Sequence, residues 1–210
     1  MIKNILFDFD GVILDSMEIR DYGFKKIVST YPKEMVDDFI KYHRYNAGLS
    51  RFVKIKYFYN HYLDQEISKL EIQVLADKFS KIMREKLPNK KYLIKEALDF
   101  IKQNNSNMHI VSGSEEKELN FLCNKLEIYK YFKTIEGSPT PKVNLVKNIM
   151  LHFNYEPRET ILIGDSINDY EAAKDNYIDF YGYNNKDLIK FSKQYIYSFQ
   201  ETFKNIEIKK

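Results

Sequence analysis

The residues best suited to chemistry are acidic and fall in two short clusters. Asp8 and Asp10 follow the apolar run at residues 5–7, and Asp165 and Asp169 follow a second apolar run further along the chain. Four carboxylates that converge on one point repel one another, so positive charge must lie among them. An all-oxygen ligand set indicates a hard cation, and Mg²⁺ is the usual choice beside phosphate.

Three further groups suit a phosphoryl ligand. Ser112 offers a hydroxyl where an apolar run ends, Gly113 lets a backbone N–H approach closely, and Lys142 offers a compact positive charge at the start of an expected helix. Donors, a cation and a spare carboxylate together predict a phosphate-handling site. One ionised Asp can attack phosphorus while a second moves protons between the leaving oxygen and water.

These residues need a scaffold that gathers strand ends. An apolar run that stops at acidic residues is typical of a buried parallel strand, and ligands of such sheets bind beyond the carboxyl ends of the strands. A rhythm of alternating strands and helices follows Pro88, so we expect an α/β fold with a Rossmann-like parallel sheet core. The expected strands are 5–7, 108–111, 132–135, 160–163, 178–183 and 195–199, and the expected helices are 94–103, 115–126, 143–153 and 169–174.

The segment between the first strand and this rhythm is helical throughout. Apolar residues at spacings of three and four predict four helices without a strand between them, the third starting at Ser50 and the fourth stopping before Pro88. We therefore predict an inserted α-helical cap domain at 15–91, with 1–14 and 92–210 forming the core. The insert carries more basic than acidic side chains, which would suit an anionic substrate or reflect codon bias alone.

The motifs resemble those of the haloacid dehalogenase superfamily. The run 8–16 (DFDGVILDS) is similar to its first motif, Ser112 to its second, and 164–169 (GDSIND) to its fourth. The third motif departs from the pattern, because Lys142 follows the prolines of 139–141 instead of preceding them. Lys147 is the second choice for that lysine.

The resemblance implies a role for each site residue. Asp8 would be the nucleophile and Asp10 the general acid and base. The other implied roles are Mg²⁺ ligation by Asp8, the Asp10 backbone carbonyl, Asp165 and Asp169, and phosphoryl binding by Ser112, the Gly113 amide and Lys142.

The insert resembles the cap of the phosphoglycolate phosphatase and β-phosphoglucomutase branch. The run 48–51 (GLSR) is similar to a loop in which the arginine meets an anionic part of the substrate, so Arg51 is a candidate substrate residue, although a plain helix start explains the run equally well. Arg20 is a second candidate. It stands where mutase relatives carry a histidine, which speaks against a mutase, and a solvated helix face is its alternative explanation.

We therefore expect a Mg²⁺-dependent phosphomonoesterase that hydrolyses a small phosphorylated metabolite through an aspartyl phosphate. A phosphomutase of the β-phosphoglucomutase type is the alternative, and a non-catalytic binding protein on the same fold is a more distant one. A dehalogenase is disfavoured, because that chemistry needs neither Asp10 nor a metal.

Composition excludes several other classes. The 210 residues carry 33 basic and 30 acidic side chains, a net charge of +3, which makes no electrostatic case for nucleic acid. The chain has no apolar stretch long enough to span a membrane, and the single cysteine, Cys123, cannot form an internal disulfide. We expect a cytoplasmic protein, a monomer or weak dimer, whose four histidines are structural.

Overall fold

The computed structural model describes residues 1–204. Its strands are β1 Asn4–Phe7, β2 Asn107–Glu115, β3 Thr134–Ser138, β4 Thr160–Gly164, β5 Asp179–Tyr183 and β6 Gln194–Ile196. Its helices are α1 Met17–Ile27, α2 Lys33–Tyr45, α3 Arg51–Tyr62, α4 Lys69–Lys86, α5 Lys95–Gln103, α6 Glu116–Lys125, α7 Lys142–His152, α8 Ile167–Asp175 and α9 Phe199–Lys204.

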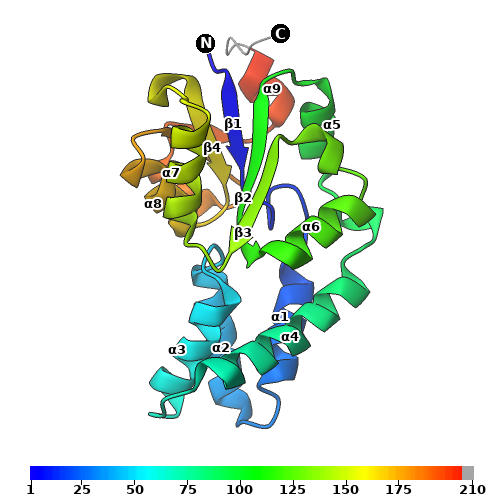
Figure 1. Cartoon of the computed structure of the whole chain (residues 1–210), viewed down its shortest axis with the longest axis vertical. Helices are drawn as coiled ribbons and strands as arrows, with labels where there is room; N and C mark the ends of the chain where they lie inside the picture. The colour runs from blue at the N-terminus through cyan, green and yellow to red at the C-terminus, as the bar shows by residue number, and fades with distance from the viewer. Residues whose placement is uncertain (205–210) are drawn as a thin grey trace.

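The strands form one parallel sheet in the order β3-β2-β1-β4-β5-β6, which places β1 at the centre (Figure 1). Phe7, the last residue of β1, is level with Ile110 of β2 and with Ile163 of β4, although β2 itself continues to Glu115. The residues that follow them are therefore delivered to a common site. The parallel sheet confirms the predicted fold class.

Helices cover both faces of the sheet. Ile5 and Phe7 belong to the apolar cluster under α5, α6 and α9, whereas Leu6 belongs to the cluster under α7 and α8. This alternation follows from the two-residue period of a strand. Because β1 is buried on both sides, its sequence is a continuous apolar run.

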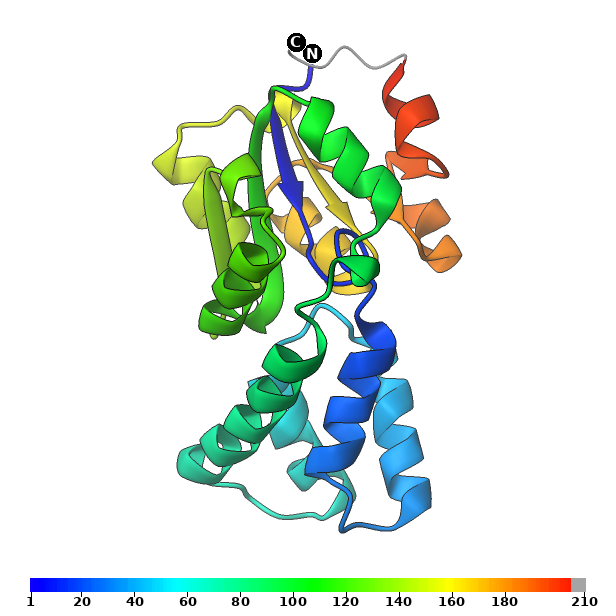
Figure 2. The ribbon, with the colours of Figure 1, turned by 90° about the vertical axis from the view of Figure 1, so that its right-hand side faces the viewer.

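Helices α1 to α4 form a separate lobe beyond the carboxyl ends of the strands (Figure 2). Its interior is aromatic: Phe24, Phe39, Phe58 and Phe79, one from each helix, are at most 2% exposed. Phe24 lies 4.4 Å from Phe79 and 5.5 Å from Phe39, ring centre to ring centre. We call residues 15–91 the helical insert; its division from the core at residues 14/15 and 91/92 stays a prediction.

Local signals account for the ends of the insert helices. The Ser50 hydroxyl accepts a hydrogen bond from the backbone N–H of Val53, as predicted for a residue that caps α3. Ser68 and Glu71 form a reciprocal capping box at the start of α4. That helix ends just before Pro88, which disfavours helical backbone in the residue that precedes it.

Three strand boundaries differ from the prediction, and the first is β3, which is Thr134–Ser138 and not 132–135. The last strand is Gln194–Ile196 and not 195–199, because Phe199 starts α9 and packs with Phe203, one helical turn on, into the core. The strand predicted over 108–111 continues to Glu115, past the Ser112-Gly113 pair. Among residues 1–204, no helix is both long enough and apolar enough to cross a membrane.

Candidate active site

Asp8 lies at the end of β1 on the face covered by α7 and α8. Leu6, two residues earlier, packs under those helices, and side chains two apart on a strand share a face. Asp8 is 3% exposed, and its Oδ1 accepts a hydrogen bond from the Phe9 backbone N–H at 2.7 Å. The central strand thus directs the predicted nucleophile toward the first turns of α7 and α8.

Asp165 and Asp169 bring their carboxylates to the same place. One oxygen from each of Asp8, Asp165 and Asp169 lies within 4.8 Å of the other two. Oδ1 of Asp165 is buried and has no hydrogen-bond partner among residues 1–204. A buried set of carboxylate oxygens with one oxygen unpartnered fits a hard divalent cation such as Mg²⁺.

The loop after β1 reaches this cluster because residue 11 is glycine. Gly11 has a φ of +78°, and a Cβ there would collide with the Asp165 carboxylate. The first and fourth motifs therefore meet at atomic contact, which their separation in sequence does not reveal.

Burial and mutual repulsion perturb the carboxyl groups. Burial, reinforced by the charge of Asp169, raises the pKa of Asp8 to about 7, although Lys142 acts in the opposite direction. Burial and the charge of Asp8 raise the pKa of Asp165 well above its usual value. A divalent cation among these groups would reverse both shifts.

Lys142 is the first residue of α7 and is 7% exposed. Its Nζ lies 2.8 Å from Oδ1 of Asp8 and also donates to Oδ1 of Asp169. Burial acts to lower the pKa of Lys142, but the charges of Asp169 and Asp8 outweigh it and raise that pKa above its ordinary value. Lys147, the second choice, is exposed on the same helix. The structure thus brings Lys142, and not Lys147, to the site.

Ser112 and Gly113 lie on β2, next to β1. Ser112 is 1% exposed and accepts a hydrogen bond from the Ser114 backbone N–H. A Cβ on Gly113 would collide with the carbonyl of Gly48, and one on Gly48 would meet the side chains of Ser166 and Asn168. The insert loop before α3 therefore rests directly on the ends of the core strands.

The Asp10 side chain forms its hydrogen bonds with residues outside the three-carboxylate cluster. Its Oδ1 accepts hydrogen bonds from Ser16 Oγ and Arg20 Nε, both at 2.5 Å, and its Oδ2 accepts one from Ser114 Oγ at 2.7 Å. Burial alone would raise the pKa of Asp10, but the Arg20 charge and the bonds from Ser16 and Ser114 outweigh it and lower that pKa. The two first-motif aspartates thus occupy different electrostatic environments.

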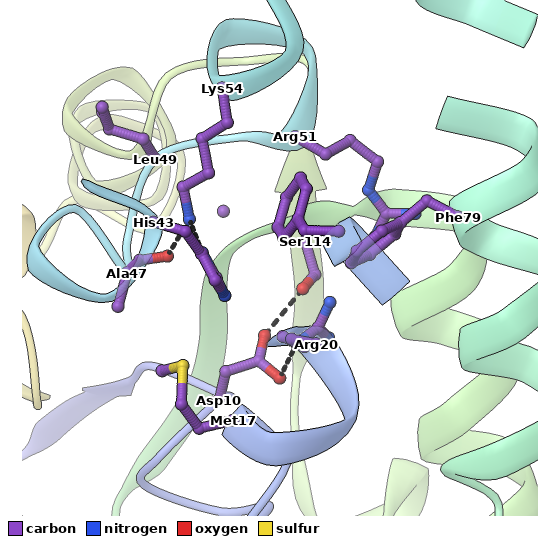
Figure 3. A pocket seen from close by; sticks show the side chains of 12 residues that line it. Asp10, Met17, Arg20, His43, Ala47, Leu49, Arg51, Lys54, Phe79 and Ser114 are labelled. Atoms are coloured by element: carbon purple, nitrogen blue, oxygen red, sulfur yellow. Dashed lines mark hydrogen bonds and ion pairs between the residues drawn. The ribbon is translucent and has the colours of Figure 1, made fainter. Parts of the chain in front are cut away.

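A pocket opens beside Asp10, between core and insert (Figure 3). Its empty volume is about 340 Å³, part of it open to solvent. Arg20 and Arg51, the predicted substrate residues, both line it, yet each is already ion-paired. Arg51 makes a two-pronged contact with Glu118 of α6, with N–O distances of 2.6 and 2.8 Å.

Two ionisable side chains of the pocket were not predicted as site residues. Lys54 of α3 and His43 of α2 line the pocket with 2% and 1% exposure, and the distance between Lys54 Nζ and His43 Nδ1 is 3.0 Å. The sequence did indicate that Lys54 is buried, because Arg51 and Lys54 share a helical face with Ile55 and Phe58. Charged residues on the apolar face of a helix are candidates for a buried polar role.

Comparison with known proteins gives consistent matches. A family model described as haloacid dehalogenase-like hydrolase matches residues 5–183. The chain is 23% identical over 184 residues to a phosphorylated carbohydrates phosphatase of Thermotoga maritima, with 81% of this chain and 79% of that protein aligned. The prediction of a phosphatase-type enzyme agrees with both findings.

Solved structures show the same fold. A β-phosphoglucomutase from Clostridium difficile superposes with a TM-score of 0.76 at 19% identity, covering 96% of this chain and 93% of its own. CbbY from Rhodobacter sphaeroides, in complex with phosphate, gives 0.74 at 16% identity, with 96% of each chain covered. The family match spans strands β1 to β5, the insert and all four acidic positions, and the chain therefore belongs to the haloacid dehalogenase-like hydrolases.

Proposed function

We propose that this protein is a Mg²⁺-dependent phosphomonoesterase that hydrolyses a small phosphorylated metabolite through an aspartyl phosphate on Asp8. One observation carries the proposal. Asp8 is buried against Lys142 and two further carboxylates, while Asp10, two residues on, lines the pocket between core and insert. The proposed nucleophile, Asp8, and the proposed proton-transfer group, Asp10, thus lie in different places, so one can attack phosphorus while the other reaches the leaving oxygen.

The metal and the phosphoryl group would share the strand-end site. Asp8, Asp165 and Asp169 would hold Mg²⁺, joined by the Asp10 backbone carbonyl. When bound, the ion supplies charge that offsets the repulsion between the nucleophile and the phosphoryl oxygens. The Ser112 hydroxyl, the Gly113 amide and the Lys142 ammonium would hold the phosphoryl oxygens in line with Asp8.

The chemistry has two displacements. In the first, a carboxylate oxygen of Asp8 attacks phosphorus, the ester P–O bond breaks, and the leaving oxygen takes a proton from Asp10. In the second, Asp10 removes a proton from water, whose oxygen attacks phosphorus. The bond to Asp8 then breaks, inorganic phosphate leaves, and Asp10 keeps the proton that the next cycle needs.

The surroundings of Asp10 favour hydrolysis over phosphate transfer to a second hydroxyl. Arg20, Ser16 and Ser114 lower its pKa, which favours the carboxylate form that deprotonates water in the second displacement; the proton for the first displacement is the one kept from the preceding cycle. Arg20 occupies the place where a mutase would carry a histidine, and its guanidinium cannot give up its proton. A mutase remains the alternative that the experiment below tests.

The insert would act as the cap that excludes bulk water. Its loop at Gly48 touches both Gly113 and the Ser166–Asn168 segment, so it covers the strand ends where the phosphoryl group would bind. The similarity to the phosphorylated carbohydrates phosphatase of Thermotoga maritima supports a phosphorylated carbohydrate as substrate. We retain the predictions of a cytoplasmic monomer or weak dimer.

The test is phosphate release from a panel of phosphorylated carbohydrates and related esters, with Mg²⁺ and with a chelator. We expect turnover by the wild type that chelator abolishes and that Asp10→Ala lowers by about 10²- to 10⁴-fold. Conversion of a sugar phosphate into its isomer without phosphate release would establish the mutase instead. Turnover that survives chelator would refute the metal-dependent mechanism.

A further inference from the structure

Three basic side chains enter the pocket beside Asp10, and two of them are neutralised. Arg20 Nε lies 2.5 Å from Asp10 Oδ1, and Arg20 also lies 3.5 Å from Glu118. Arg51 is held by both oxygens of Glu118 and by Ser80 Oγ. Two guanidinium groups therefore face two carboxylates, and their charges cancel.

Lys54 is the third basic group, and among residues 1–204 it takes part in no ion pair. Its Nζ has two polar neighbours, His43 Nδ1 and the carbonyl oxygen of Ala47, each at 3.0 Å. An ammonium has three donors, so one N–H is left to point into the pocket. Figure 3 shows Lys54 extending toward the pocket from α3, with Asp10 and Arg20 on the opposite side.

His43 does not compensate the lysine charge. Burial, followed by the charge of Lys54, lowers the pKa of His43 well below its usual value, so the ring is neutral. Its Nδ1 can then accept from Lys54, while Nε2 lies 3.5 Å from Asp21 Oδ1. Asp21 in turn pairs with Arg44 outside the pocket, so its charge is already matched and adds no negative charge to the pocket.

We propose that Lys54 is the specificity-determining residue of the insert and binds a second anionic group of the substrate, a carboxylate or a second phosphoryl group on the leaving part of the ester. The inference rests on the proposed function, because it assumes that the transferred phosphoryl group occupies the strand-end site. It assigns to Lys54 the anion-binding role that sequence reasoning gave to Arg20 and Arg51.

The geometry fixes how such a substrate lies. Asp10 and Gly113 border both the strand-end site and the pocket, so the leaving oxygen meets Asp10 and the rest of the leaving group extends into the pocket. The far wall carries Lys54, 2% exposed. A neutral leaving group would leave this buried cation without a counter-charge, whereas an anionic group would supply one.

The experiment uses matched esters that differ only in the distal charge. Glycerol 3-phosphate and 3-phosphoglycerate differ in having a hydroxymethyl group or a carboxylate, and fructose 6-phosphate and fructose 1,6-bisphosphate differ in a second phosphoryl group. For the wild-type holoenzyme we expect kcat/KM to be about 10- to 100-fold higher for the more anionic member of at least one pair. The pair that shows the preference identifies the anion as carboxylate or phosphoryl.

Lys54→Met keeps the length of the side chain and removes its charge. We expect it to reduce the preference ratio at least about ten-fold, mainly through KM, and Lys54→Arg to restore part of it. Lys56→Met changes an exposed lysine on the same helix and serves as the matched control. A wild type without any preference, or a Lys54→Met enzyme that keeps the full ratio, would overturn the inference.

A binding measurement separates this inference from the proposed function. Calorimetry of Asp8→Asn with 3-phosphoglycerate and with glycerol 3-phosphate reports the distal contact without turnover. If the wild type hydrolyses no ester while Lys54→Met still removes a binding preference, the phosphatase proposal fails and the anion subsite stands. If the wild type hydrolyses esters and Lys54→Met weakens the binding of both ligands equally, the phosphatase proposal stands and the anion subsite fails.

Discussion

The strand-end site and the insert pocket are built on opposite electrostatic principles. At the strand ends, three carboxylates face one lysine, and burial together with the charge of Asp169 raises the pKa of Asp8 to about 7. In the pocket, three basic groups face two carboxylates, and the excess is positive. A site with surplus carboxylate suits a cation, and a site with surplus ammonium suits an anion. The comparison therefore separates residues that would perform the chemistry from residues that would select the substrate.

Asp8→Asn tests the strand-end half of this comparison and has the largest expected effect. An amide of the same shape cannot form an acyl phosphate, so phosphate release should fall by at least about 10⁴-fold. In chelator, the same change should raise the thermal midpoint, because it removes a carboxyl group whose ionised form is disfavoured by burial and by the charge of Asp169.

Asp175→Asn, at the exposed far end of α8, is the control. It should leave the rate of phosphate release and the thermal midpoint unchanged. Retention of more than about one hundredth of the wild-type rate by Asp8→Asn would exclude Asp8 as the nucleophile.

The two sites also differ in how far sequence alone could predict them. Asp8, Ser112 and Asp165 follow apolar strand runs, and the parallel sheet delivers such residues to one edge whatever the details of packing. Lys142 followed from its place at a helix start, despite the altered order of prolines. A rule of backbone topology was sufficient for each of these residues.

The pocket follows no such rule. Arg51 is neutralised by Glu118, which lies 67 positions away on α6, and neither residue belongs to a motif that would join them. Lys54 and His43 meet only because α2 and α3 pack side by side around Phe24 and Phe58. The helical periodicity places Lys54 on a buried face, but which partner neutralises a buried charge depends on tertiary contacts between helices. Substrate selectivity is therefore the part of the function that sequence could not specify.

Breaking the Arg51–Glu118 pair tests whether the pocket charges are balanced in the way described. Glu118→Gln leaves a buried guanidinium without its counter-charge and should lower the free energy of unfolding by about 3 kcal/mol. Arg51→Met combined with Glu118→Leu should recover at least half of that loss, since an apolar pair has no charge to compensate.

Glu116→Gln, exposed on the same helix, is the control for urea unfolding and should cost less than about 1 kcal/mol. If Glu118→Gln is no more destabilising than Glu116→Gln, the pair is solvated and the pocket does not isolate Lys54.

The smallest expected effect is that of Lys54→Met, which should raise the free energy of unfolding, whereas Glu118→Gln should lower it. Burial, then the charges of Arg20, Arg51 and Lys142, lowers the pKa of Lys54 from 10.5 to about 7, while Asp10 acts to raise it and His43 faces it as a neutral ring. A base with a depressed pKa in the folded state opposes folding fully below pH 7, and the penalty fades as pH rises toward 10.5. Lys54→Met should therefore increase stability by about 1–2 kcal/mol at pH 7, after the loss of two hydrogen bonds is counted, and the gain should shrink by pH 9.5.

Urea unfolding of the wild type and Lys54→Met at pH 6.5, 8 and 9.5 measures this difference. A variant that is less stable at pH 7 would show that the ammonium is already compensated within the protein, and the distal anion would then have no charge to meet. A variant that is more stable, yet has lost its preference for the more anionic ester, would mean that folding tolerates an uncompensated charge at position 54 which only the substrate neutralises. Stability and selectivity would then oppose each other at this one residue, which is the pattern expected when a buried charge is retained for binding.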